Sequence, residues 1–410
     1  MSEIKRLKDV ANIYDSLHQT PQYTSNSNYK IIRVVDIKEG VLSLEKSLNV
    51  NYETYLNYTK KYTPKNGDII ITRVGSYGIC SYVYTKEKFC LGQNLALINP
   101  LINSKYLYYC LISPDVKNQI ESLVVGTTQK TISLFNISNL NILVPNIKEQ
   151  QAIADVLSSF DDKIELNNKI IKNLEEQAQS LYKHWFVDFE FPDKGGKPYK
   201  SNGGKFKESE LGLIPEDWEI YKIKDLTTCL PGGTPSRNRE DYWNGDIPWI
   251  NSGKVNDFRI TKPSEYITEA GLKNSATKYM SKNTIVLAIT GATLGQISIL
   301  GINTCANQSV VGISETQQLP HEYLYCCLTN RINEILSHQT GGAQQHINKE
   351  NIEDFKLIYN EDIVREFKNF IESTFEKQLG LAIENQKLIE TRDYLLPKLM
   401  NGEIKVSDIK

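Results

Sequence analysis

The second half of the sequence repeats the first, segment by segment and in the same order. Residues 3–10 match residues 219–226, and Tyr106–Tyr108 match Tyr323–Tyr325. The other matches are Gly75 and Gly78 with Gly291 and Gly295, Cys90 and Gln93 with Cys305 and Gln308, 126–132 with 341–347, and 167–171 with 385–389. All of them lie at nearly the same offset, between 215 and 218 residues. Because such a repeat decides the architecture of a chain, the sequence predicts two copies of one structural unit.

Each copy begins with a segment that combines short apolar runs with amphipathic stretches. The runs Asp68–Thr72 and Thr284–Ile289 stand between Gly, Asn and Pro residues, as strands do. Residues 105–121 and 321–336 have the apolar spacing of helices. The predicted fold class is therefore α+β, with one α/β domain in each copy.

A long helix with a coiled-coil pattern follows each of these domains. In residues 146–190, apolar residues recur every seven positions in two series, which start at Ile153 and Leu157. The pattern lasts for about five heptads, which is typical of helices that pack along a seam. The second copy keeps the register more loosely, because Gln378 and Arg392 interrupt it. The predicted seam residues are Ile153, Leu157, Phe160, Ile164, Asn167, Ile171, Leu174, Leu181, Ile371, Phe375, Ala382, Asn385 and Ile389.

Asn167 and Asn385 occupy equivalent positions in the two seams. Each is either an asparagine tolerated at the surface or part of a central polar layer. A polar layer of this kind would fix the register between two antiparallel helices.

The pattern divides the chain into alternating domains and helices. The predicted segments are a first domain (1–145), a central helix (146–190), a connector (191–216), a second domain (217–358), a distal helix (359–398) and a C-terminal tail (399–410). The connector is rich in Gly, Lys, Pro and Ser, which predicts an exposed segment. Two similar domains on two antiparallel coiled-coil helices would be related by pseudo-two-fold symmetry.

The sequence holds no motif for catalysis. It contains no Pro-Pro dipeptide, which an amino-methyltransferase tetrad requires, and no GxxxxGK[ST] phosphate loop. The five histidines and seven cysteines have no metal-ligand spacing. No apolar stretch is long enough to span a membrane and the start is unlike a secretory signal, so a cytoplasmic location is expected. These features favour a binding protein that is not an enzyme and holds no metal.

The distribution of charge differs between the two domains. The whole chain has a formal net charge of −2. Residues 1–145 hold 16 Lys and Arg against 11 Asp and Glu, whereas residues 216–358 hold 13 against 16. The first domain could attract phosphates through its bulk field, and the second only through a local patch.

Three stretches carry a resemblance to a known family. Residues 148–157 (KEQQAIADVL) and 181–186 (LYKHWF) resemble the central conserved region of Type I restriction-modification specificity subunits. Residues 211–219 (LGLIPEDWE) are similar to the start of the second half in that family, and 392–404 (RDYLLPKLMNGEI) resemble its C-terminal region. The distal helix departs from the pattern, since Asp362–Phe367 stands where the central helix has Glu-Gln-Gln-Ala-Ile-Ala.

The resemblance implies a DNA sequence-specificity subunit of a restriction system, without catalytic activity of its own. Each globular segment would be a target recognition domain for one half of a bipartite, asymmetric site in double-stranded DNA. The helices would act as a ruler and would dock two methyltransferase (modification) subunits, through which translocase-endonuclease (restriction) subunits join. S-adenosylmethionine, ATP and Mg would be bound by those partner subunits and not by this chain.

Four polar loops, two in each domain, are the predicted DNA contacts. Glycine lets a backbone approach phosphate, while Arg, Lys, Gln and Asn side chains pair with phosphates or base edges. The loops are 73–78, 126–130, 290–295 and 341–346, and each could equally be a structural β-turn. The predicted DNA-binding residues are Arg73, Ser76, Tyr77, Thr127, Thr128, Gln129, Lys130, Arg237, Lys254, Thr293, Gln344, Gln345 and His346.

An alternative interpretation is a coiled-coil scaffold with two ligand- or protein-binding domains and no role in DNA binding. It would account for the helices and for the near-neutral charge, but not for the family-like stretches.

Overall fold

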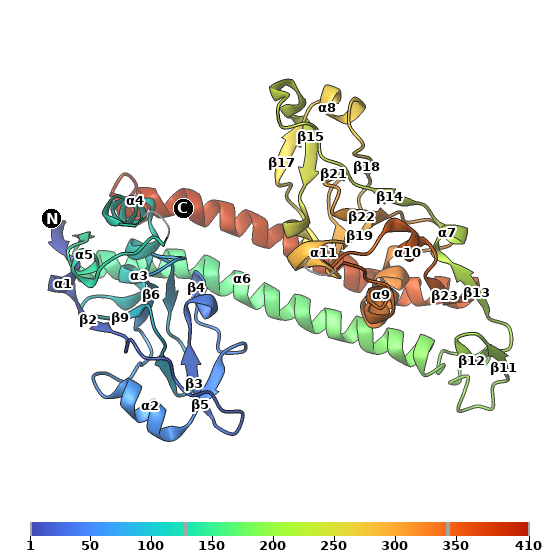
Figure 1. Ribbon diagram of the computed structural model, residues 1–410, viewed down its shortest axis with the longest axis horizontal. Coiled ribbons are helices and arrows are strands. Elements are labelled where there is room, and N and C mark those ends of the chain that lie inside the picture. Colours follow the sequence, from blue (N-terminus) through green and yellow to red (C-terminus); the bar gives the residue numbers. More distant parts are fainter. Residues whose placement is uncertain (1, 127–128, 342–344, 409–410) are drawn as a thin grey trace. The chain divides into compact units, whose positions relative to one another are not determined.

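The chain divides into two compact units, and both of its long helices contribute to both. The computed structural model describes residues 2–126, 129–341 and 345–408. The first unit is Met1–Glu165 with Lys387–Lys410, and the second is Leu166–Gln386. Each unit therefore contains one globular domain and part of each long helix (Figure 1).

The globular domain of the first unit combines β-sheets with short helices. Its strands are β1 (Glu3–Arg6), β2 (Ala11–Asp15), β3 (Tyr29–Ile32), β4 (Gly40–Val41), β5 (Leu48–Val50), β6 (Ile69–Thr72), β7 (Cys80–Tyr82), β8 (Phe89–Leu91), β9 (Leu95–Pro100) and β10 (Asn141–Val144). Its helices are α1 (Leu7–Val10), η1 (Val34–Asp36), α2 (Tyr52–Thr59), α3 (Ser104–Ile112), α4 (Pro114–Leu123) and α5 (Leu134–Ser138). The strands form sheets in the orders β2-β9-β6-β7-β4, β5-β3-β8 and β1-β10. The small β5-β3-β8 sheet and α2 lie at the opposite end of this domain from α4 and α5 (Figure 1).

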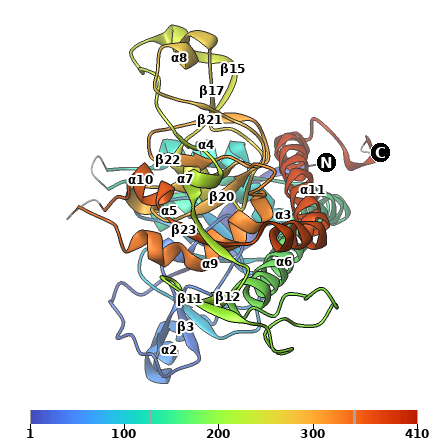
Figure 2. The ribbon, with the colours of Figure 1, turned by 90° about the vertical axis from the view of Figure 1, so that its right-hand side faces the viewer.

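The globular domain of the second unit has the same kinds of element. Its strands are β11 (Phe206–Ser209), β12 (Gly212–Pro215), β13 (Glu219–Lys222), β14 (Cys229–Pro231), β15 (Trp243–Ile250), β16 (Arg259–Ile260), β17 (Glu265–Ile267), β18 (Tyr279–Met280), β19 (Ile285–Ala288), β20 (Ile297–Leu300), β21 (Thr304–Ala306), β22 (Val310–Ile313) and β23 (Lys356–Tyr359). Its helices are α7 (Ile223–Leu226), η3 (Glu240–Tyr242), η4 (Ser252–Asn256), α8 (Glu269–Lys273), η5 (Gly291–Thr293), α9 (His321–Leu336) and α10 (Lys349–Glu353). The sheets have the orders β14-β22-β19-β20-β16, β17-β15-β21-β18, β13-β23 and β11-β12. In Figures 1 and 2, β15, β17 and α8 project away from α9 and β23.

The two domains share one topology. The order β2-β9-β6-β7-β4 corresponds strand by strand to β14-β22-β19-β20-β16. The edge strands β4 and β16 also match, since each pairs in parallel with its neighbour while the central pairs are antiparallel. The central strands β6 and β19 are completely buried, as expected of apolar runs covered on both faces. The predicted repeat of an α+β domain is confirmed.

The two long helices run antiparallel within each unit. Helix α6 (Ile147–Tyr182) continues into a π-helical turn, η2 (Lys183–Val187), and α11 spans Glu361–Met400, followed by η6 (Val406–Asp408). In the first unit, Leu157 near the start of α6 shares a core with Leu395 near the end of α11. In the second unit, the ring of Tyr182 lies 6.3 Å from that of Phe367, near the start of α11.

One expectation for local structure is wrong, and another holds for only part of its segment. Residues 105–121 form two helices instead of one, because Ser113 is extended (ψ 150°) and Pro114 starts α4. The residue before a proline is disfavoured in the helical conformation, so the helix breaks there. The connector is not wholly exposed either: Phe191 and Ile214 are buried, and the ring of Phe191 lies 4.9 Å from that of Trp218.

Candidate functional site

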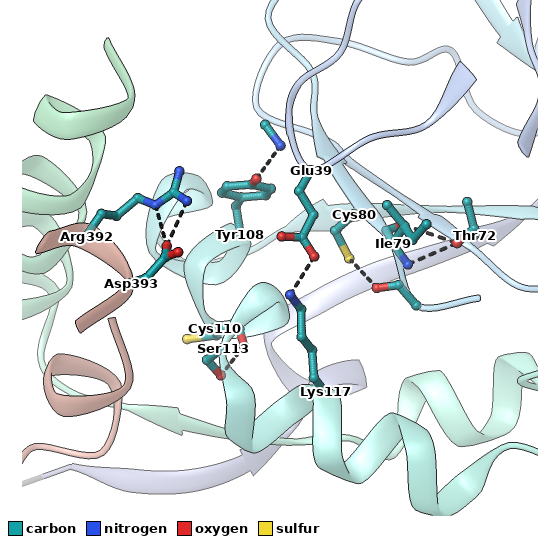
Figure 3. A network of polar contacts seen from close by, with 12 residues as sticks. Glu39, Thr72, Ile79, Cys80, Tyr108, Cys110, Ser113, Lys117, Arg392 and Asp393 are labelled. Atoms are coloured by element: carbon teal, nitrogen blue, oxygen red, sulfur yellow. Dashed lines mark hydrogen bonds and ion pairs between the residues drawn. The ribbon is translucent and has the colours of Figure 1, made fainter. Parts of the chain in front are cut away.

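In the first domain, the two predicted loops lie against each other and form one surface. Residue Val74 pairs with Thr131 in a β-bridge, and Gly75 N donates to the carbonyl of Lys130 at 3.0 Å. The loop after β6 is closed by hydrogen bonds between Thr72 and Ile79, which Figure 3 shows. Gly75 has a φ of +74°, which favours glycine at this position. Residues 73–78 with 125–126 and 129–132 are called the first loop pair below.

The second domain repeats this arrangement. Thr290 pairs with His346 in a β-bridge, and Ile347 N donates to the carbonyl of Ile289 at 3.1 Å. Gly291 and Gly295 have positive φ values of 69° and 83°. Residues 290–295 with 340–341 and 345–347 are the second loop pair. Loops about 50 residues apart in the sequence thus meet in the same way in both domains.

Lys130 is the exposed cation of the first loop pair. Its Nζ lies 2.9 Å from Glu121 Oε1 and 3.2 Å from the hydroxyl of Tyr77, which donates to Glu121 Oε2 at 2.5 Å. The hydrogen bonds to Glu121 and Tyr77 raise the pKa of Lys130, so its ammonium remains charged. The Lys130 and Glu121 side chains are 50% and 59% exposed, so the ion pair is weak and Lys130 can turn to another anion.

Arg73 is held more firmly by its own domain. Its side chain is only 12% exposed and forms an ion pair with Asp15, and Nε donates to the carbonyl of Ile132 at 3.4 Å. This arrangement fastens the first loop pair to β2. Ser76 and Gln129 are exposed on the same loop pair, whereas Thr127 and Thr128 lie outside the described residues.

The side chains of the second loop pair are less basic. Thr293 is half-buried, and its Oγ1 donates to the carbonyl of Thr290 at 3.4 Å. His346 is exposed, and its Nε2 lies 3.3 Å from Thr340 Oγ1. Gln345 is exposed, and Gln344 lies outside the described residues.

The two cations predicted elsewhere in the second domain have different surroundings. Lys254 belongs to η4, which contacts η5 of the second loop pair, and its Nζ lies 3.1 Å from Asp257. Arg237 instead belongs to the projecting part of the domain. Its guanidinium stacks 3.6 Å from the ring centroid of Trp243 and donates two hydrogen bonds, of 2.6 and 2.9 Å, to Glu265.

A glutamine turn beside each loop pair was not among the predicted contacts. Gln93 Nε2 donates to Thr20 Oγ1 at 3.3 Å, and in the second domain Thr234 Oγ1 donates to Gln308 Oε1. The residue after each glutamine accepts a backbone hydrogen bond of 2.9 Å: Asn94 from Arg73 of the first loop pair, and Ser309 from Ile289, which directly precedes the second loop pair. The match of Gln93 with Gln308 in the repeat was the signal that could have identified them.

The predicted seam residues lie along α6 and α11 at two levels of burial. Ile153, Leu157, Asn167, Ile171, Ile371, Phe375 and Asn385 are buried, whereas Phe160, Ile164, Leu174, Leu181, Ala382 and Ile389 are half-buried. In the second unit, Asn167 Nδ2 donates to Asn385 Oδ1 at 2.9 Å and to Glu384 Oε2 at 2.8 Å. Asn385 Nδ2 in turn donates to Asn168 Oδ1 at 2.9 Å. The two asparagines therefore form a buried polar layer between the helices.

Comparison with protein families identifies the origin of the repeat. A family model described as Type I restriction modification DNA specificity domain matches the chain twice, at residues 2–176 and 215–385. The chain belongs to this family. The matches confirm the prediction of a specificity subunit with two recognition domains, and DNA target specificity is the role that membership assigns to them.

Individual relatives agree over most of the chain. The Type I restriction enzyme HindI specificity subunit of Haemophilus influenzae is 26% identical over 407 residues, covering 83% of this chain and 87% of the relative. The MjaIX specificity subunit of Methanocaldococcus jannaschii is 29% identical over 372 residues, covering 88% and 83%. The crystal structure of a Type I system S subunit from M. genitalium shares the fold, with a TM-score of 0.56 at 18% identity, and covers 98% of this chain and 96% of that one. Across the described residues, no helix is both long and apolar enough to cross a membrane.

Proposed function

We propose that each domain reads one half of a bipartite, asymmetric site in double-stranded DNA with its loop pair and glutamine turn. The main support for this proposal is that the same surface occurs in both domains, while some of its side chains differ between them. The glycines, the bridge between loops and the Gln–Thr contact recur in both domains, whereas Lys130 is replaced by Gln345. Shared parts would hold phosphates, and parts that differ would read different bases.

The chain contributes no catalytic group in this proposal and assembles with subunits that do. Exposed apolar side chains on the long helices support docking of methyltransferase subunits there: Leu166 is 52% exposed, Phe370 69% and Tyr394 60%. Restriction subunits would join through the methyltransferases. S-adenosylmethionine, ATP and Mg would be bound by these partners. Methyl transfer by the isolated chain, freed of contaminating enzyme, would contradict the proposal.

The first test changes the charge of the first loop pair in opposite directions. Lys130→Ala removes a cation, and Glu121→Gln removes the carboxylate that competes with DNA for it. In the complex assembled with methyltransferase subunits, Lys130→Ala should weaken DNA binding and lower the salt slope by about one, while Glu121→Gln should strengthen binding.

Gln345→Ala, at the matched position of the second domain, is the control. It should leave the salt slope unchanged, because it removes no charge. If the affinity and slope of both first-domain variants equal those of the wild type, the loop pair is not the DNA-binding surface.

The second test concerns the glutamine turns. Gln93→Ala and Gln308→Ala should each weaken binding without changing the recognised sequence, since a feature common to both domains is expected to contact the common phosphate backbone. Methylation mapping by long-read sequencing gives the recognised sequence for each variant. A change of base preference confined to one half-site would instead show that the glutamine contacts a base.

A further inference from the structure

A buried cluster of two glutamates and a histidine lies outside the proposed DNA-binding surfaces. Glu315 follows β22, and His321 and Glu322 begin α9. His321 Nδ1 lies 2.8 Å from Glu315 Oε1 and 3.3 Å from Glu322 Oε2. The three potential ligand atoms all lie within 4.8 Å of one another. The side chains of His321 and Glu322 are 9% and 1% exposed.

The hydrogen bonds of this cluster leave one carboxylate oxygen without a donor. A ring nitrogen carries at most one hydrogen, and Glu315 is the closer acceptor for the one on Nδ1. Glu322 Oε2 is buried and has no hydrogen-bond partner among the described residues. Buried polar atoms are almost always satisfied by a partner, so this oxygen points to a ligand in the cluster.

The surroundings of the cluster resemble the outer shell of a metal site. Asn283 Nδ2 donates to Glu315 Oε2 at 3.2 Å, which fixes the carboxylate and leaves Oε1 directed at His321. The ring of Phe375, on α11, packs edge-on against that of His321 at 5.7 Å. The Glu315 side chain is 28% exposed, so one side of the cluster can admit an ion and a water molecule.

We propose that Glu315, His321 and Glu322 bind a divalent transition-metal ion, with Zn²⁺ as the best match. One imidazole nitrogen and two carboxylate oxygens suit Zn²⁺, and a water molecule would complete a tetrahedron. Ligand atoms at about 2.0–2.2 Å from one ion lie roughly 3.3–3.5 Å apart, so small side-chain shifts would open the cluster to this geometry. Bound there, the ion would fasten the start of α9 to the segment after β22, beside α11.

The composition of the site also predicts its selectivity. Mg²⁺ prefers six oxygen ligands in an octahedron and retains its waters, so it should compete poorly. The positive charges of Arg259 and Lys368 act on Glu322 and will reduce affinity relative to thiolate sites. The first domain offers an internal comparison, since the positions matched to His321 and Glu322 hold Ser104 and Lys105. One ion per chain is therefore expected.

The experiment uses the full-length chain, without an affinity tag and stripped of metal by a chelator. Zn²⁺ binding is measured by competition with a chromophoric chelator, and Co²⁺ is added separately to record the visible spectrum of the ligand field. The variants are Glu315→Gln and His321→Gln, and His338→Gln, an exposed histidine outside the cluster, is the control. Circular dichroism checks the folding of each variant.

The wild type and His338→Gln should bind one Zn²⁺ and give a tetrahedral Co²⁺ spectrum, and bound Zn²⁺ should raise the temperature of unfolding. Each cluster variant should lose affinity by at least about tenfold. Equal affinity in wild type and Glu315→Gln, or no stoichiometric binding by the wild type, would overturn the proposal. Because no DNA is involved, the result is independent of the proposed function.

Discussion

Different polar groups join the two domains to the long helices, at positions separated by nearly one repeat. Gln378 of α11 lies 217 residues after Asp161 of α6, and Arg392 of α11 lies 217 residues after Glu175 of α6, one residue short of the 218 that separate Asn167 and Asn385. The first joint is Tyr109, Asp161 and Arg392 in the first unit. The second joint is Glu175, Gln378 and Arg259 in the second unit.

The first joint is a satisfied network at the edge of the core. Asp161 accepts hydrogen bonds from the hydroxyl of Tyr109 at 2.6 Å and from Arg392 at 2.5 Å. Arg392 also donates to Asp393, as Figure 3 shows. The side chains of Asp161 and Arg392 are 26% and 24% exposed, so neither charge is fully desolvated.

The second joint is more deeply buried and less well satisfied. Gln378 is completely buried, and neither of its amide atoms has a partner among the described residues. Arg259 donates to the carbonyl of Phe375 at 3.3 Å, but its Nε has no partner there. Burial lowers the pKa of Arg259 to about 10 and raises the pKa of Glu175. Polar groups thus join each domain to the long helices, but their hydrogen bonds are satisfied in the first joint and incomplete in the second.

The largest effect is expected at the first joint. Asp161→Ala should lower the free energy of unfolding by about 2–3 kcal/mol, because the buried Tyr109 hydroxyl and Arg392 both lose their acceptor. Asp161→Asn keeps an acceptor and should cost less. Urea unfolding followed by circular dichroism measures the loss. A loss equal for both variants would mean that the charge, and not the acceptor for Tyr109, stabilises this joint.

The asparagine layer tests a place where both helices have the same residue. Asn167→Leu and Asn385→Leu should each cost about 1–2 kcal/mol, since each leaves one buried amide without its partner. The double variant should cost less than the sum of the two, because no unpaired amide remains. Tryptophan fluorescence is a suitable probe, as Trp185, Trp218, Trp243 and Trp249 all lie in the second unit. Additive costs would show that the two amides do not act together.

At the second joint the expected sign is reversed. Gln378→Leu should raise the free energy of unfolding by about 1 kcal/mol, because it replaces two unpaired polar atoms with an apolar group of similar size. Tryptophan fluorescence follows the unfolding of Gln378→Leu in the second unit, and circular dichroism follows that of Asp161→Leu, the corresponding substitution in the first joint. Destabilisation by both substitutions would show that the joints are equivalent after all.

The smallest effect concerns pH at the second joint. Because burial raises the pKa of Glu175, its contribution to stability is present below the ordinary glutamate range and is lost as the pH rises through the raised value. Glu175→Gln should therefore be more stable than the wild type at neutral pH and nearly equal to it below about pH 4.5. Stability curves measured between these pH values check the sign. A variant that is less stable at neutral pH would mean that the carboxylate is paired favourably.

The repeat, the fold class and the two long helices could all be predicted from the amino-acid sequence. Heptad and strand patterns depend on residues close together in the sequence, so they can be recognised without knowledge of tertiary contacts. Asn167 and Asn385 could likewise be matched from the register of the repeat. The break at Ser113–Pro114 also had a local signal, the proline, which the amphipathic pattern of residues 105–121 obscured.

Other features depend on contacts between segments that are distant in the sequence. Val74 and Thr131 are far apart in the sequence, so no local pattern shows that their loops form one surface. From the sequence, Arg73 is predicted to contact DNA, but in the structure its guanidinium forms an ion pair with Asp15 on β2. Glu315, His321 and Glu322 do not have a metal-ligand spacing in the sequence. The loop after β22 and the first turn of α9 bring them together in the structure. Burial and partners are properties of packing between segments, and they decide whether a polar residue holds the fold or remains free to bind.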